Sequence, residues 1–325
     1  MAASSSRVKK EHYVTQFYLR EWATGECVHV FDKTSSRQFP GNIGRIGCEQ
    51  AFYDDAELDE LAGDPQSLEK FFHGFESAGA TVIRDTLSSI RADNLTVLPE
   101  SARIDLAIFL GIQQLRTKRA RAAAGDLMEA ISKQQFLAYL RRTQPDLPIE
   151  ESSLEMEANE RARFAAQFHL VTDEEARVGM AGVFFHRHWL LLRNRQATGL
   201  YTSDHPIVEH GEITPEGESL AGTLALQAVS KSGSKGIFRK LLPVLLMNVF
   251  AVAPIAVFPL APDVVLVMLD RVKYPNSASL DGRLQDMYAR DIEFYNSLQV
   301  LQSHRQVYSR DPDFQLAERL CKPAA

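Results

Sequence analysis

Hydrophobic positions in the first half of the chain recur at helical spacing. Between residues 65 and 92, Leu68, Phe72, Phe75 and further apolar residues return every three or four positions, which predicts one long amphipathic helix. Asp64 and Pro65 precede this run and are typical of a helix N-cap and first helical position. We therefore expect the helix to begin at about residue 65 and to bury one face.

A second helix is expected to begin near residues 99–101 and to lie at the centre of the fold. Its sequence IDLAIFLGI is apolar around most of the helical circumference, as in a helix that other elements surround. In the stretch QQLRTKRARAAAG that follows, basic residues replace the apolar ones and Gly125 can close the helix. Two further helices are expected at about 126–142 and 150–169, separated by the proline-containing TQPDLP.

Short β-branched and aromatic runs predict strands. ECVHVFDK predicts one strand near the start of the chain, and SSRQFPGNIG after it predicts a loop. From about residue 187, strands of one sheet are predicted for HWLLLRN, TGLYTSD, APIAVFPL, VVLVMLD and RQVYSRD, with a helix at about 283–303 before the last.

The order of these elements predicts an α+β fold, in which a helical bundle packs on an antiparallel β-sheet formed mainly by the C-terminal half. No repeat or clear linker interrupts it, so we expect a single domain over residues 1–325. Its expected parts are a flexible tail at 1–10, a mainly helical part at 11–185, and a part of mainly strands plus one C-terminal helix at 186–325.

Composition limits the function classes. With 325 residues, 45% hydrophobic and 24% charged, the chain can bury a large core and is not a disordered protein. The net charge of −6 argues against a surface that binds nucleic acid everywhere, although a local basic patch is compatible with it. Cys27, Cys48 and Cys321 lie far apart, so neither a zinc knuckle nor a disulfide framework is indicated, and a reducing, cytoplasmic location fits best. The opening MAASSSRVKKEH lacks the apolar run of a signal peptide or anchor.

One uncharged segment is long enough to cross a bilayer. It runs from Leu241 to Pro262 and is flanked by Arg239 and Lys240. Four prolines interrupt it, Asn248 lies near its middle, and a second apolar run follows at once. Buried strands explain this pattern better than a membrane span, so we expect no membrane association.

The long helix carries the first candidate for chemistry. At 100° per residue, Glu69 and Glu76 fall near each other at the edge of the apolar stripe, with His73 between them. Two carboxylates and an imidazole could bind a divalent metal or divide acid and base roles. The spacing matches no diagnostic metal motif, and glutamates at a helix edge are more often solvated or paired with a basic residue.

The central helix carries the second candidate. Gln113 and Arg116 are neighbours on one side of it, and an arginine at the end of a buried helix needs an internal carboxylate or a bound anion. Pairing with Glu69 or Glu76 is the simpler alternative to a functional role. Lys118, Arg119 and Arg121 extend the positive charge, either as a nucleic-acid patch or as a solvated helical face.

A third candidate stands at a strand end, in LYTSDHPIV. Asp204 lies where loops often carry catalytic groups, although aspartate is also an ordinary turn residue. Ser203, Asp204 and His205 are adjacent in sequence, which does not make a catalytic triad. The GxSxG, Walker, GxGxxG and HExxH signatures are absent from the chain.

Several motifs together resemble a bacterial family, the domain-of-unknown-function family 4238. EHYVTQFYLREW, VHVFDK and NIGRIGCEQAFYD are similar to the opening of its members, which typically start HYVPQFYLRNF; Thr15 replaces the usual proline. QQLRTKRAR is similar to the family's Q-x-x-R-T-P-x-x-R with Lys118 in place of proline, YTSDHPI to its SDxP turn, and FPLAP to its PLxP. The paired glutamates and the region around Asn296 also agree, so the resemblance spans nearly the whole chain. It implies no particular reaction.

The resemblance selects eight polar positions: His12, Glu69, Glu76, Gln113, Arg116, Arg121, Asp204 and Asn296. If they converge, they would suit a nuclease-like hydrolase of phosphodiester bonds, with a toxin or defence effector as one biological setting. His12, Gln113, Arg116 and Asp204 would then be catalytic, with His12 as general acid or base and Arg116 stabilising phosphate charge.

In this hypothesis Glu69 and Glu76 would hold Mg²⁺ or Mn²⁺, and Arg121 and Asn296 would bind substrate. A basic patch of Arg116, Lys118, Arg119 and Arg121 would contact nucleic acid. The alternatives are a non-catalytic ligand-binding or protein-interaction module and a purely structural hydrogen-bonded network. Neither the substrate nor the oligomeric state follows from the sequence.

Overall fold

The centre of the molecule is a five-stranded sheet covered by helices on both faces. The computed structural model describes residues 10–54, 59–60, 63, 66–144, 154–155, 157–211 and 253–322. The sheet has the order β10-β5-β9-β8-β7, and its pairs are antiparallel except for β10 with β5. The strands are β5 (His188–Arg193), β7 (Val208–His210), β8 (Ile255–Ala261), β9 (Val264–Leu269) and β10 (Arg283–Asp286).

Strand β8 shows why its sequence is apolar throughout. Ala256, Phe258 and Leu260 point into the main core cluster, whereas Val257 points into a second cluster on the other face. Successive side chains of a strand alternate between faces, so a strand covered on both sides has no polar face. The apolar run therefore reflects burial within the protein.

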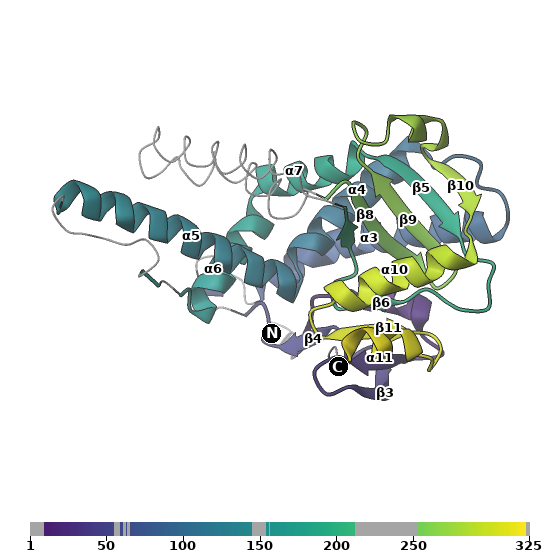
Figure 1. Cartoon of the computed structure of the whole chain (residues 1–325), viewed down its shortest axis with the longest axis horizontal. Coiled ribbons are helices and arrows are strands. Elements are labelled where there is room, and N and C mark those ends of the chain that lie inside the picture. Colours follow the sequence, from purple (N-terminus) through teal and green to yellow (C-terminus); the bar gives the residue numbers. More distant parts are fainter. Residues whose placement is uncertain are drawn as a thin grey trace, which may run out of the picture.

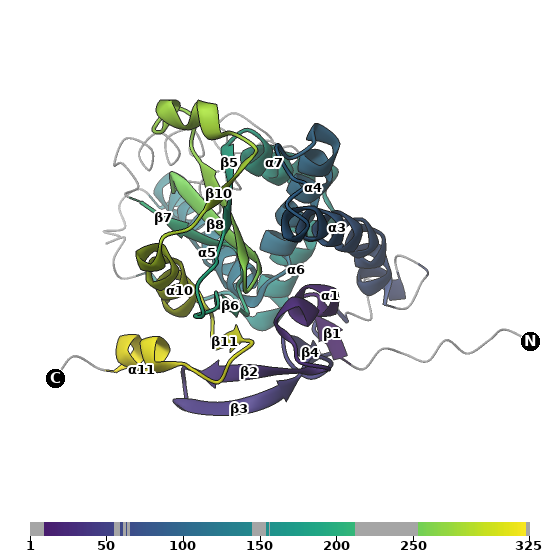
Figure 2. The same ribbon diagram turned by 90° about the vertical axis from the view of Figure 1, so that its right-hand side faces the viewer.

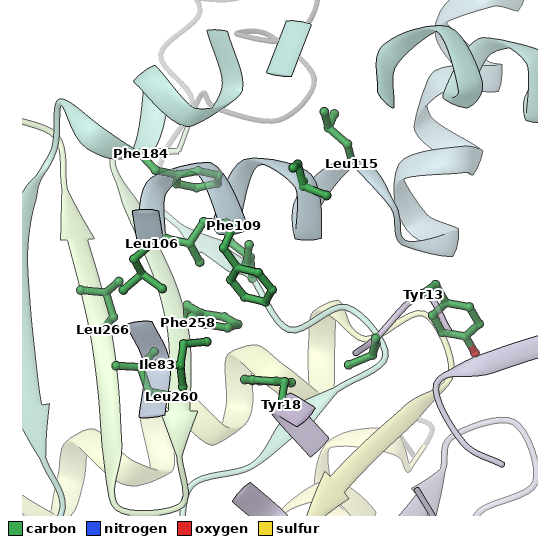
Figure 3. Close-up of a cluster of buried hydrophobic side chains, with 14 of the residues drawn as sticks. Tyr13, Tyr18, Ile83, Leu106, Phe109, Leu115, Phe184, Phe258, Leu260 and Leu266 are labelled. Carbon is green, nitrogen blue, oxygen red and sulfur yellow. The ribbon is translucent and has the colours of Figure 1, made fainter. Parts of the chain in front are cut away.

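Helices α3 (Ser67–Arg91), α4 (Glu100–Leu115) and α7 (Glu174–Phe185) contribute to the main core cluster on one face of this sheet. Figure 3 shows Leu106 and Phe109 of α4 beside Phe258 of β8. The central helix approaches its neighbours closely at glycines. A Cβ on Gly79 of α3 would lie 2.3 Å from the Phe109 ring, so only glycine fits there without a shift.

Helix α10 (Ala289–Gln302) covers the opposite face of the sheet, where Ile292 and Leu298 pack against Val257 and Val267. A 3-10 helix, η3 (Pro275–Leu280), precedes it, and α11 (Gln315–Cys321) follows. Lys33 donates hydrogen bonds from Nζ to the carbonyl oxygens of Val300 and Ser303 at 2.8 and 3.0 Å, and so caps the C-terminal end of α10.

A four-stranded sheet joins both ends of the chain. Its order is β3-β2-β11-β6, from β2 (Cys27–Asp32), β3 (Arg37–Asn42), β6 (Thr202–Ser203) and β11 (Gln306–Ser309). Figure 2 shows this sheet below the five-stranded one, with α10 and α11 beside it. N-terminal and C-terminal strands therefore depend on each other for pairing.

The opening aromatic segment packs between the two sheets. It comprises β1 (Lys10–His12), α1 (Gln16–Leu19) and the 3-10 helix η1 (Arg20–Trp22), and β1 pairs with β4 (Cys48–Gln50). Tyr18 is fully buried and donates from its hydroxyl group to the Pro259 carbonyl at 2.8 Å. Trp22 donates from Nε1 to the Leu200 carbonyl at 2.9 Å. Tyr18 and Trp22 are therefore core residues, and the polar atom of each has a hydrogen-bond partner.

Helix α5 (Lys118–Thr143) leaves the core and extends away from the sheets, partly accompanied by α6 (Glu160–Thr172), as Figure 1 shows. It starts immediately after α4 because the Thr117 hydroxyl oxygen accepts from the Ala120 amide at 3.2 Å and caps a new helix.

The predicted α+β class is confirmed, as are the long helix, the central helix and the strands β2, β5, β8, β9 and β11. Other predictions were wrong. The strands form two large sheets rather than one, and β3 replaces the loop predicted from SSRQFPGNIG. Pro40 is tolerated there because β3 is an edge strand. Gly125 lies inside α5 and closes no helix. Helix α7 was not predicted, and Lys10 of the predicted tail belongs to β1.

The uncharged segment is only partly described, because residues 241–252 lie outside the described residues. Its remainder contains β8, a buried strand. Within the described part of the chain, none of the helices combines the length and the hydropathy that a membrane span requires.

Candidate functional site

Arg116 is the centre of the polar cluster. It follows the last residue of α4 and is 1% exposed. Nη1 donates to Glu76 Oε1 at 2.6 Å, Nη2 donates to the His12 carbonyl, and Nε lies 3.4 Å from the Tyr53 hydroxyl group. Burial alone would lower the pKa of Arg116, but Tyr53 and Glu76 raise it above its usual value. The guanidinium therefore stays cationic.

The Phe72 and Tyr53 rings enclose this guanidinium. Its central carbon lies 4.3 Å from the Phe72 ring centroid and 5.9 Å from that of Tyr53. Tyr53 in turn donates from its hydroxyl group to the Arg116 carbonyl at 2.9 Å. Every nitrogen that could contact a phosphate is thus directed at this chain's own atoms, so Arg116 acts as an internal tie.

His12 is held in the same cluster at the end of β1. Its ring is buried, Nε2 lies 3.2 Å from the Ile43 carbonyl, and Nδ1 lies 3.4 Å from Gln16 Nε2. This arrangement assigns the proton to Nε2, which donates to Ile43, while Nδ1 accepts from Gln16. Burial lowers the pKa of His12, and the nearby Arg116 contributes. The imidazole is therefore neutral at pH 7.

The two glutamates of α3 have different environments. Glu76 is the carboxylate partner of Arg116, which is one of the alternatives that the sequence left open. Glu69 has a buried Oε2 for which we find no hydrogen-bond partner in the described structure. Burial raises the pKa of Glu69 to about 7; Arg116 opposes this shift, and Glu76 and Asp54 add to it. In the described ranges, no set of three His, Cys, Asp or Glu side chains is placed to hold a metal ion.

Gln113 faces the opening segment from α4. Its Nε2 donates to the Tyr13 carbonyl at 2.8 Å, next to the His12 carbonyl that Arg116 binds. Two side chains one turn apart therefore bind successive carbonyls of the opening segment.

The basic run that follows is engaged by internal partners. Arg121 lies with its guanidinium carbon 3.6 Å from the Phe52 ring centroid and donates to Gln167 Oε1 and the Phe52 carbonyl, both at 2.7 Å. Lys118 pairs with Glu49, and Arg119 donates to the Gln302 carbonyl at 2.6 Å. With Arg116 buried, these four residues do not form one exposed basic patch.

Asp204 lies in the turn after β6 and is 2% exposed. Its carboxylate accepts hydrogen bonds of 2.8, 2.8 and 2.9 Å from the backbone amides of residues 304–306. Burial raises the pKa of Asp204 against these donors. The carboxylate thus fixes the chain entering β11. Neighbouring His205 stays neutral at pH 7. Burial lowers the pKa of His205 to about 3, and the nearby Arg119 and His304 contribute.

Asn296 lies on α10, apart from the Arg116 cluster. Oδ1 accepts from the Tyr201 amide at 2.7 Å, and Nδ2 donates to the Gly199 carbonyl at 3.1 Å. It also lines a groove of about 580 Å³ between α10, α11 and residues 196–198. Glu293 and Arg319, an exposed ion pair, line the same groove, as does Asp313.

The structure brings together His12, Glu69, Glu76, Gln113 and Arg116, and it places Arg121 near them on the next helix. Asp204 and Asn296 lie elsewhere. Asp204 binds the backbone that leads into β11, and Asn296 joins α10 to the backbone of residues 199 and 201.

The comparison with protein families gives a match over most of the chain. Residues 10–313 match the model of the family described as "Protein of unknown function (DUF4238)". The chain belongs to this family. Neither a curated protein nor a solved structure matches it.

In this DUF4238 chain, sequence reasoning missed the residues that complete the cluster. Glu11 is fully buried and accepts from the Tyr53 amide and from Gln66 Nε2. Glu11 stands beside His12 in the opening motif, and a charged residue directly before an aromatic run was the available signal. Tyr53 carried no comparable signal, because its contact with Arg116 spans 63 positions.

Proposed function

We propose that this DUF4238 protein is a non-catalytic ligand-binding or protein-interaction module, and that its polar cluster is structural. The observation that carries the proposal is the enclosure of Arg116. A hydrolase of phosphodiester bonds needs a cation directed at the place where charge develops, with room for the substrate beside it. Arg116 instead is 1% exposed and is bound by Glu76, the His12 carbonyl and Tyr53.

The charge around the cluster supports the same proposal. Glu69 and Glu76 stand on α3, and Glu11 and Asp54 contribute further carboxyl groups. Carboxylates repel a phosphodiester unless a cation neutralises them. The basic residues that could compensate, Lys118 and Arg121, are engaged by Glu49 and Gln167.

We place ligand binding in the groove beside Asn296. Its size of about 580 Å³ suits a small molecule or a peptide end. Asp313 and Glu293 offer negative charge and Arg319 positive charge, which suits a zwitterion such as a free amino acid or a dipeptide. Thermal shifts measured with free amino acids and dipeptides test this. We expect stabilisation that Arg319→Glu abolishes and Arg290→Glu, an exposed change on α10 outside the groove lining, retains.

The second candidate is the hydrolase, favoured by one observation: Glu69 Oε2 is buried and has no hydrogen-bond partner among the described residues, so this oxygen could bind a cation. In this candidate Mg²⁺ or Mn²⁺ would be held on the Glu69 and Glu76 face.

Cleavage of single- and double-stranded DNA and RNA, with Mg²⁺ or Mn²⁺, separates the two candidates. We expect wild type to cleave no faster than Glu69→Gln. Metal-dependent cleavage by wild type that Glu69→Gln loses, although the variant melts no lower than wild type, would favour the hydrolase instead.

A further inference from the structure

Glu11 is a carboxyl group buried between three segments. It stands on β1, is fully buried, and accepts from the Tyr53 amide in the segment after β4 and from Gln66 Nε2 at 3.3 Å, just before α3. The backbone amide of Gln66 donates to Asp59 Oδ2 at 2.9 Å. Glu11 therefore connects the β1–β4 hairpin with the start of α3.

Asp54 lies beside Glu11, because the amide of the preceding residue, Tyr53, donates to Glu11, and Asp54 Oδ1 is buried. Two ionised carboxylates next to each other in the interior repel, because each only accepts hydrogen bonds. Retention of one proton by the pair relieves this repulsion, as in other pairs of adjacent carboxyl groups.

The charges around this pair favour retention of the proton. Among the described residues, Glu69 on α3 faces Glu11 with a negative charge, and Arg121 on α5 faces it with a positive one. Arg121 donates its hydrogen bonds to Gln167 and Phe52 and not to Glu11. Arg116 is directed at Glu76 and the His12 carbonyl. Burial is the largest cause that raises the pKa of Glu11 to about 7.

We propose that Glu11 and Asp54 share one proton that fastens the β1–β4 hairpin to the start of α3, and that loss of this proton loosens the hairpin. At acid and neutral pH the shared proton joins the two carboxyl groups. Above neutral pH two negative charges lie side by side in the interior. Local opening of the hairpin hydrates them at a lower free-energy cost than unfolding of the whole protein. Opening would bring the His12 carbonyl and Arg116 into contact with water.

Hydrogen exchange tests this proposal. The amides of residues 10–14 and 50–54 are compared with those of β9 at about pH 6 and about pH 8.5, after correction for the intrinsic exchange rates. A folded-state pKa of about 7 against 4.5 in the open state predicts that hairpin protection falls about tenfold over this interval and stays below that of β9, because the hairpin opens without unfolding of the sheet.

Two variants locate the effect. In Glu11→Gln an amide donates to Asp54 at every pH, and in Asp54→Asn an amide donates to Glu11, so each variant should keep its hairpin protection constant between the two pH values. The second variant covers the case in which the first fails to fold. Glu49→Gln, opposite Glu11 across the hairpin and exposed, is the control and should retain the tenfold fall.

Constant protection in wild type, or an equal tenfold fall in Glu11→Gln and Asp54→Asn, would overturn the proposal. So would restoration of wild-type protection at about pH 8.5 by Mg²⁺ or Mn²⁺, because the group between the carboxylates would then be a metal ion.

Discussion

The Arg116 guanidinium donates to the Glu76 carboxylate at 2.6 Å, and the two side chains differ sharply in exposure, at 1% and 27%. The arginine is inside the protein and the glutamate reaches it from the solvent side of α3. Loss of either partner therefore has unequal consequences. Without Glu76 the buried guanidinium loses its counter-ion, whereas without Arg116 the carboxylate can be hydrated and the buried carbonyl of His12 loses its donor.

Glu76→Gln is expected to lower the free energy of unfolding by about 3–5 kcal/mol, because it leaves the buried Arg116 guanidinium without a counter-ion. Replacement of Arg116 by methionine leaves a carboxylate that water can hydrate, and should cost about 1–3 kcal/mol through the unpaired His12 carbonyl. Urea denaturation of the two variants measures both values. Equal, small losses would mean that the guanidinium is not an internal tie.

The pH dependence of stability should report Glu69. Its pKa is raised from 4.5 to about 7, so between these values the folded protein retains a proton that the unfolded chain has lost. Stability is therefore highest below about pH 4.5 for this group and falls as pH rises towards 7.

We expect Glu69→Gln to be more stable than wild type by on the order of 1 kcal/mol at about pH 8, and to lose this advantage at about pH 4.5. Chemical denaturation at both pH values checks the sign. A variant that is less stable than wild type at about pH 8 would show that ionised Glu69 is stabilising.

Asp204→Asn should destabilise the protein by about 3 kcal/mol. The carboxylate accepts three backbone amides, and a carboxamide offers one oxygen and directs an NH₂ group at the remaining donors. Thermal and urea unfolding provide the measurement, and Asp311→Asn, an exposed change beyond β11, is the control. If Asp204→Asn instead leaves stability unchanged, a role other than holding β11 must explain this residue.

Two glycines of the same helix should respond to alanine in opposite directions. Gly79→Ala places a Cβ 2.3 Å from the Phe109 ring and should cost about 1–3 kcal/mol through overpacking. Gly74, on the exposed side of α3, has no atom within 4 Å of such a Cβ, so Gly74→Ala should stabilise by up to about 1 kcal/mol through helix propensity. Equal effects of the two changes would contradict the close contact between α3 and α4.

The sequence by itself determined the elements whose signal is local. The spacing of Leu68, Phe72 and Phe75 indicated α3, because one buried face makes apolar residues recur at the helical period. The apolar runs indicated β8 and β9, because strands buried on both faces are apolar throughout. Family motifs also selected His12, Glu76, Gln113 and Arg116 of the cluster, and the cost of burying a lone charge made a glutamate one of two expected partners for Arg116.

Only the tertiary structure decided which strands pair and what the polar residues do. β2 and β11 are separated by most of the chain, and β3 is a strand because β2 offers it an edge, despite Pro40. Likewise, Tyr53 and Glu11 acquire their roles from neighbours far along the chain. Local patterns state whether a side chain is buried, but the partner that satisfies a buried polar atom is fixed by long-range packing.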